Sequence, residues 1–306
     1  MSAAPSLTSR DWGILAVLAL VWGSSFLLIE LGLTGFGPLT LVFLRIALAV
    51  PLMLVAMRVA GQRLPRDAHS WWQLTIIGFL NLAFSQALFF WAQTRIDSGL
   101  SSILNATVPL WGVVMAHYFT RDERATPAKV MGVVIGFAGL VVMVGPDALA
   151  GVGQDVAAQL ACLLATACFA AAAVWARRLG SHVQPLAAAT GQMMTAAVML
   201  LPLPLLFETP FAAAPSLTAV AALLTLAIVA TSFTYLLYFR LIATAGASNA
   251  MLIALLMPPV AIGLGVLFLN ETLTGGQLLG LALILTGLII IDGRLVARLA
   301  LRRAVP

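Results

Sequence analysis

Charged residues are scarce in this sequence. Asp, Glu, Lys and Arg make up only 9% of the 306 residues, whereas 62% of the residues are hydrophobic. A soluble domain carries about 25% charged residues and about half apolar ones. The shortage of charge therefore excludes an ordinary soluble protein and predicts an integral membrane protein.

The excess of positive charge does not form a basic surface. The chain holds 16 Lys and Arg against 11 Asp and Glu, a net charge of +5. The basic residues stand in short clusters between apolar runs, as the loop charges of membrane proteins do. We therefore expect the lipid bilayer as the surroundings of the chain and no nucleic acid as a partner.

Cysteine and the usual residues of enzyme sites are scarce too. Cys162 and Cys168 are six residues apart in one apolar run, about 240° apart around a helix. Neither a disulfide nor a metal pair is expected from them. The sequence contains no metal-ligand cluster, phosphate-cradling loop or acid/base pair of carboxylates. It thus predicts no metal, no cofactor and no enzyme activity, with a membrane-embedded enzyme or a channel as the minor alternatives.

Long apolar runs are what the chain has in abundance. A run of about 17–25 residues crosses a bilayer as a helix, and a helix is required because lipid offers the backbone no hydrogen bonds. About ten runs qualify, which predicts an all-α membrane protein with short loops. The predicted spans are Trp12–Leu31, Leu39–Met57, Trp72–Trp91, Leu100–Phe119, Ala128–Val144, Val156–Ala176, Leu186–Phe207, Leu217–Leu241, Ala247–Leu269 and Gln277–Ile291.

The basic residues also predict an orientation. With a cytoplasmic N-terminus, fourteen of the sixteen Lys and Arg fall in cytoplasmic segments, Arg95 falls in an outside loop and Arg45 lies within a span. Cytoplasmic loops of membrane proteins carry this excess of Lys and Arg. Both termini are therefore expected in the cytoplasm.

The two halves of the chain repeat each other. "RDERATPAKVMGVVIGFAGLVVM" at 121–143 aligns with "LNETLTGGQLLGLALILTGLIII" at 269–291, an offset of 148. The alignment matches Glu123 with Glu271, Thr126 with Thr274, Gly132 with Gly280 and Gly139 with Gly287. An odd number of spans in each half turns the second half upside down, which is a transporter architecture. We predict two inverted five-helix repeats, residues 1–147 and 148–306.

The run "WGSSFLLIELG…PLTLVFLRIALA", the repeated Glu-x-x-Thr and Gly endings and the five-plus-five layout resemble the drug/metabolite transporter superfamily. Within it the chain is most similar to the EamA-type exporters, among them bacterial exporters of amino acids, including aromatic ones. The resemblance implies an inner-membrane exporter with a central cavity walled by spans 1, 3, 4, 6, 8 and 9. It also implies that spans 5 and 10 pack outside as support.

Polar residues inside spans are candidates for the cavity, because each needs a partner or a function in the membrane. Asn81, Ser85 and Phe89 recur every four residues in span 3 and share a face. Asn105 and Pro109 do the same in span 4. We expect these residues to line the cavity; the alternative is that they form ordinary hydrogen bonds and packing between helices.

Aromatic side chains suggest the kind of substrate. A weaker echo of the repeat, at an offset of 147, places Trp22 over Phe169 at mid-depth, and Tyr235 is a third candidate for the wall. Such rings suit a substrate with an apolar or aromatic flank, although packing alone would also explain them. Pro109 and Pro258 interrupt spans 4 and 9 near their middles and are read as hinges or as static kinks.

Arg45 needs a partner because it lies about seven residues inside span 2. Glu30 lies near the outer end of the neighbouring span 1, and helical side chains lean toward the N-terminus, which brings the two groups together. We predict a Glu30–Arg45 ion pair; a snorkelling arginine and a contact with a substrate carboxylate are the rivals. A structural pair would leave no carboxylate free to carry protons, so export is expected to run without obligatory proton coupling.

Taken together, these patterns predict a monomeric exporter of small molecules that works by alternating access. Amino acids with apolar or aromatic side chains are the expected substrates. Other small organic compounds or drugs are the alternative, because members of the family export chemically different molecules.

Overall fold

The computed structural model describes residues 8–119, 126–144, 154–179, 183–210, 214–245 and 253–292, and every regular element in these ranges is a helix. η1 and η3 are π-helical turns and η2 is a 3₁₀ turn. The helices are α1 (Ser9–Leu33), α2 (Pro38–Val59), α3 (Ala68–Gly78), η1 (Phe79–Ala83), α4 (Phe84–Ala92), α5 (Ser98–Asn105), α6 (Val108–Phe119), α7 (Pro127–Val144), α9 (Gln154–Ala176), η2 (Arg177–Leu179), α10 (Pro185–Leu200), α11 (Pro202–Phe207), α12 (Leu217–Ala227), η3 (Ile228–Phe233), α13 (Thr234–Ala245), α15 (Ile253–Leu269) and α16 (Gly275–Asp292).

These helices make up the expected spans. Among the described residues, seven helices are long and apolar enough to cross a membrane, and three shorter apolar helices stand where spans 5, 9 and 10 are predicted. Spans 3 and 8 are each one helix with a π turn in the middle, and span 4 is α5 followed by α6. The prediction of an all-α membrane protein with about ten spans is confirmed. The boundary between the repeats at residues 147 and 148 lies outside the described residues.

Local sequence signals explain where several helices begin. α1 starts at a capping box, in which the Thr8 hydroxyl accepts from the Asp11 amide and the Asp11 carboxylate accepts from the Thr8 amide. Asp67 caps α3 by accepting from the amide of Ser70 at 2.7 Å. Ser216 caps α12 in the same way. These polar residues stand just outside the apolar runs and mark their ends.

The inverted repeat is visible in two matching contacts, which we call clamps. In each clamp, one side chain accepts hydrogen bonds from two backbone amides at the start of a helix in the other half. The carboxylate of Glu208 accepts from the amides of Leu39 and Thr40, at 2.8 and 2.9 Å, where α2 begins. The side-chain oxygen of Gln62 accepts from the amides of Leu186 and Ala187, at 3.0 and 3.3 Å, where α10 begins. The second clamp repeats the first about 147 residues away, with the roles of the halves exchanged.

The two clamps lie at opposite ends of the bundle and serve to name them. The Glu208 end is where α1 ends and α2 begins, and the Gln62 end is where α2 ends and α3 begins. α1 ends at the Glu208 end. Its counterpart α9 begins there, since Ser101 and Thr107 of span 4 pair in the same order with Cys162 and Thr166. The two halves therefore run in opposite directions.

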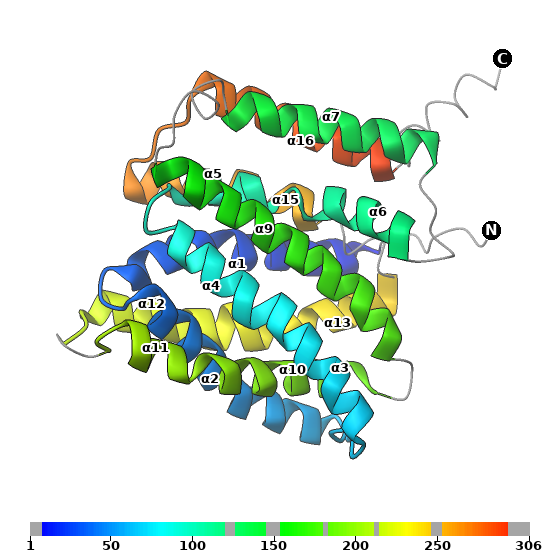
Figure 1. Cartoon of the computed structure of the whole chain (residues 1–306), viewed down its shortest axis with the longest axis vertical. Helices are drawn as coiled ribbons and strands as arrows, with labels where there is room; N and C mark the ends of the chain where they lie inside the picture. Colours follow the sequence, from blue (N-terminus) through cyan, green and yellow to red (C-terminus); the bar gives the residue numbers. More distant parts are fainter. Residues whose placement is uncertain are drawn as a thin grey trace.

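Helices α7 and α16 form a pair at one edge of the molecule (Figure 1). Glycines let their backbones touch: a side chain on Gly132 would meet the carbonyl oxygen of Gly287, and one on Gly139 would meet that of Gly280. This is the close packing that small residues at four-residue spacing allow. Spans 5 and 10 thus pack outside the rest of the bundle, as the resemblance implies.

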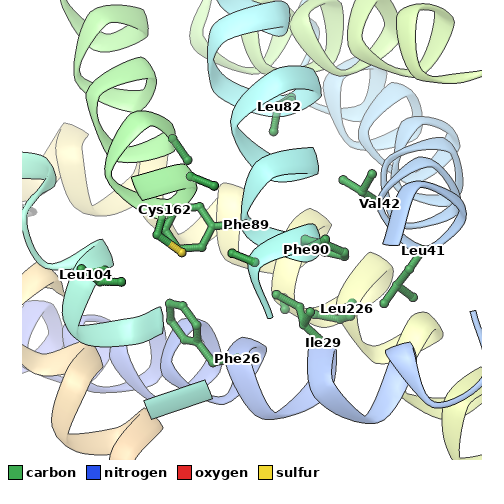
Figure 2. Close-up of a cluster of buried hydrophobic side chains, with 14 of the residues drawn as sticks. Phe26, Ile29, Leu41, Val42, Leu82, Phe89, Phe90, Leu104, Cys162 and Leu226 are labelled. Atoms are coloured by element: carbon green, nitrogen blue, oxygen red, sulfur yellow. The ribbon is translucent and has the colours of Figure 1, made fainter. Parts of the chain in front are cut away.

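The remaining spans enclose an apolar core. Its largest cluster joins residues of both halves, including Phe26, Ile29, Phe90, Leu104 and Leu226 (Figure 2). All five side chains are buried. Several members of this cluster, among them Phe26 and Ile29, also line the cavity described below.

Candidate substrate-binding cavity

A cavity of about 510 Å³ lies between the two halves. Residues of every span except 5 and 10 line it, so the wall includes spans 2 and 7 in addition to the six that the resemblance implies. Pockets for small molecules have volumes of about 300–1,000 Å³ and mostly apolar walls with a few polar groups. The cavity has this size and this chemistry.

The cavity reaches one end of the bundle and not the other. Its lining includes Ala176, the last residue of α9, and Ile253, the first described residue of α15, both at the Gln62 end. Toward the Glu208 end the lining stops at Ile29 and Phe89, about one turn before α1 and α4 end. The Glu208 end is therefore the closed end.

A third clamp holds the closed end together across the two halves. Glu271, between α15 and α16, accepts from the amides of Ser98 and Gly99 at the start of α5, at 2.8 and 2.9 Å. A helix N-terminus favours a carboxylate there. Only glycine fits beside that carboxylate, since a side chain on Gly265 would collide with it.

Two π-helical turns occupy corresponding places in the repeats. η1 lies in the middle of span 3 and η3 in the middle of span 8, and each contributes a polar residue to the cavity wall, Asn81 and Thr231. A π turn widens the helix and is found frequently at functional sites. Both turns lie at the depth where inverted-repeat transporters bind substrate.

Most of the predicted cavity residues line the cavity. They are Trp22, Asn81, Phe89, Asn105, Pro109, Phe169 and Tyr235. Phe89 stacks on Phe169 with ring centroids 5.7 Å apart, and the indole nitrogen of Trp22 donates to the hydroxyl of Thr234 at 3.0 Å. The side chain of Asn105 has no hydrogen-bond partner among the described residues and faces the cavity.

Ser85 does not line the cavity, which corrects the expected face of span 3. Its side chain is fully buried, whereas Gln86 takes a place in the wall. The expectation assumed regular α-helical spacing after Asn81. The π turn η1 inserts a wider turn, so the residue five positions on, and not four, returns to the cavity face.

The predicted Glu30–Arg45 ion pair is not formed, which is a second correction. Arg45 instead donates from Nε to the hydroxyl of Thr231 at 2.9 Å and from Nη1 to Gln86 at 3.4 Å. Glu30 makes no hydrogen bond to it, and one of the carboxylate oxygens of Glu30 is buried without a hydrogen-bond partner among the described residues.

Arg45 and Gln192 are the polar wall residues that the expected set of spans leaves out. They lie in spans 2 and 7, and the 147-residue offset of the repeat matches one with the other. Gln192 accepts from the side-chain amide of Asn81 at 3.0 Å, just as Arg45 contacts Thr231. A polar pair thus joins η1 to span 7 and another joins η3 to span 2, each time between the two halves. The repeat offset was the sequence signal that could have identified Arg45 and Gln192 as wall residues.

The two predicted hinges differ in their surroundings. Span 4 is interrupted at residues 106–107, directly before Pro109, and Pro109 lines the cavity. α15 continues through Pro258, which lies inside the helix. Motion about either proline stays a prediction.

Ten apolar helices in two inverted repeats around a mid-depth cavity define a membrane transporter with no soluble domain in the described chain. The EamA-like transporter family matches the chain twice, over residues 11–145 and 156–292. The chain belongs to this family, one copy of its domain in each half.

Several relatives are named as transporters or exporters. The chain is 28% identical to the "uncharacterized transporter YoaV" of Bacillus subtilis, over 90% of this chain and 94% of that protein. It is 27% identical to a "probable terminal-alkyne amino-acid exporter" of Streptantibioticus cattleyicolor, over 95% and 96% of the two chains. It is 29% identical to a "probable amino-acid metabolite efflux pump" of Escherichia coli K12, over 92% and 95%. A crystal structure of a chain 20% identical to this one shares the fold, with a TM-score of 0.68 over 95% of this chain and 99% of the other.

Proposed function

We propose that this transporter exports small organic metabolites from the cytoplasm, and that amino acids with apolar or aromatic side chains are among them. The observation that carries the proposal is the cavity between the halves, whose wall combines stacked aromatic rings with a few polar groups. Relatives named for the export of amino acids or their metabolites support the same class of substrate.

The direction of transport rests on the orientation of the chain. The clusters of Lys and Arg favour a cytoplasmic Gln62 end. With that orientation the cavity faces the cytoplasm, and the clamps of Glu208 and Glu271 close the outside. Export requires the Glu271 clamp to open while the Gln62 end closes, which is alternating access between inverted halves.

A screen tests the proposal. Cells that overproduce the protein should survive toxic analogues of aromatic and branched amino acids, and inside-out vesicles should accumulate the labelled parent compounds. Asn105→Leu should reduce this transport, because Asn105 faces the cavity. Trp111→Phe is the matched control, since Trp111 packs against Phe137 of α7 outside the cavity. Transport of unrelated cationic drugs alone, with no amino acid moved, would replace the proposal with its alternative.

A further inference from the structure

We infer that Arg45 receives the carboxylate of the transported molecule, so that the substrates are organic acids with an apolar flank, with or without an amino group. The inference rests on the proposed function and names the chemical class more closely. It makes Arg45 the residue that selects substrates by charge.

Arg45 is the one charged side chain in the described wall of the cavity. It lies within span 2, about seven residues from the start of α2. Its contacts are all uncharged: the hydroxyl of Thr231 at 2.9 Å, the amide oxygen of Gln86 at 3.4 Å, and the ring of Phe90, whose centroid is 5.7 Å away. No carboxylate pairs with it among the described residues.

A guanidinium within a membrane span and without a counter-ion is costly and marks a function by default. Arginine has five donors in a planar fork, and the two hydrogen bonds of Arg45 to Thr231 and Gln86 use Nε and one position on Nη1. The rest of the fork is available on a side chain that is partly exposed to the cavity. This geometry suits bidentate binding of a carboxylate.

The counterpart of Arg45 in the repeat shows what the charge adds. Gln192 is the counterpart of Arg45 in the repeat, and it forms a neutral pair with Asn81. Tyr235 lines the cavity as well and interacts with both Arg45 and Asn81. The two equivalent positions thus hold one cation and one neutral amide.

The uncharged amide side chains of the wall decide whether a substrate must carry an amino group. Gln192, Asn81 and Asn105 offer amide groups, and no Asp or Glu lines the described wall. Amides accept from an ammonium but do not require one. An amino acid, its N-acetyl derivative and the corresponding deaminated acid should therefore all enter, whereas an amine whose carboxyl is blocked would meet Arg45 with like charge.

Three probes with the same aromatic ring test this inference: phenylalanine, N-acetylphenylalanine and phenylalanine amide. Binding to the purified full-length protein is measured by calorimetry, and uptake is measured in proteoliposomes. We expect both acids to bind at least tenfold more tightly than the amide. Arg45→Met should bring the three affinities to within about twofold of one another, whereas Arg45→Lys should retain a preference for the acids.

Two further variants separate charge selection from general damage. Gln192→Met should weaken the acids and the amide alike and leave their ratio unchanged. Arg95→Met removes an arginine that stacks on Trp91 outside the cavity and should leave all three affinities at the parent value. If Arg45→Met does not fold, the inference is still tested by the ratio of the affinities for the acids and the amide in the wild-type protein and in Arg45→Lys.

The outcomes distinguish this inference from the proposed function. Equal binding or transport of the amide and the acids by the parent would overturn the role of Arg45 while leaving an exporter in place. An unchanged preference in Arg45→Met would do the same. Failure to bind or move any of the probes, or any compound of the wider screen, would overturn both.

Discussion

The guanidinium of Arg45 donates to the hydroxyl of Thr231 at 2.9 Å, which joins span 2 of the first half to the π turn of span 8 in the second. It does not pair with Glu30, the acidic residue nearest to Arg45 in the sequence. This contact turns a charge toward the cavity. Export without obligatory proton coupling was expected because Arg45 would hold Glu30 in an ion pair. Since this pair is not formed, that reason no longer applies.

A double-mutant cycle tests this arrangement. Arg45→Met and Glu30→Gln should change the free energy of unfolding additively, with a coupling under about 0.5 kcal/mol, because groups without shared partners behave independently. Glu30→Gln alone should leave the protein as stable or more stable, since a buried carboxylate oxygen without a partner costs free energy. Thermal unfolding in detergent measures both. A coupling of about 1 kcal/mol or more would restore the ion pair.

The glycines between α7 and α16 give a prediction of stability. Gly139→Ala should destabilise the protein by about 1–3 kcal/mol, because the new methyl group would meet the backbone oxygen of Gly280 at 2.7 Å and backbone cannot move cheaply. Gly263→Ala in α15 is the matched control, since nothing lies within 4 Å of its added carbon. It should be neutral or slightly stabilising. Equal melting temperatures for the two variants would contradict the close packing.

The Glu271 clamp predicts a change in access to the cavity. Glu271→Ala removes the acceptor of two amides at the start of α5 and should favour opening of the Glu208 end. A cysteine at Ile29, one of the two wall positions at which the lining stops toward that end, should then react several-fold faster with an impermeant thiol reagent added outside intact cells. Asp67→Ala, which removes a helix cap at the other end, should leave the rate unchanged. A rate that Glu271→Ala does not alter would mean that this clamp does not hold the gate.

The orientation has its own test. Cysteine at Thr34, an exposed position at the Glu208 end, should react with an impermeant reagent in intact cells, and cysteine at Ala60, exposed near the Gln62 end, should react only after permeabilisation. Native Cys162 and Cys168 are buried, so they should contribute little labelling of their own. The reverse pattern would overturn the orientation drawn from the basic residues.

Much of this architecture could be predicted from the sequence because its signals are local. Apolar runs predict spans, and the match of residues 121–143 with 269–291 predicts that the two halves repeat each other. Mid-depth Trp22, Phe169 and Asn105 were expected on the cavity, and they line it.

What could not be predicted depends on rotation about the helix axes. The π turn η1 has no compositional signature, and it exchanges Ser85 for Gln86 on the cavity face. Depth along spans 1 and 2 placed Glu30 and Arg45 at comparable levels, but depth says nothing of the direction in which each side chain points. The packing of η3 against α2 decides that direction for Arg45.

The measurement that tests most directly whether this cavity is the transport path compares two glycines. Gly112 lines the cavity and Gly13 is exposed on α1, and nothing lies within 4 Å of a carbon added to either. Counterflow of labelled phenylalanine in proteoliposomes is measured for Gly112→Phe and Gly13→Phe at matched melting temperatures. The account predicts that Gly112→Phe retains less than about a tenth of the parent rate, because a ring of this size fills a large part of a small-molecule site, while Gly13→Phe transports like the parent. Parental counterflow by a folded Gly112→Phe would contradict it.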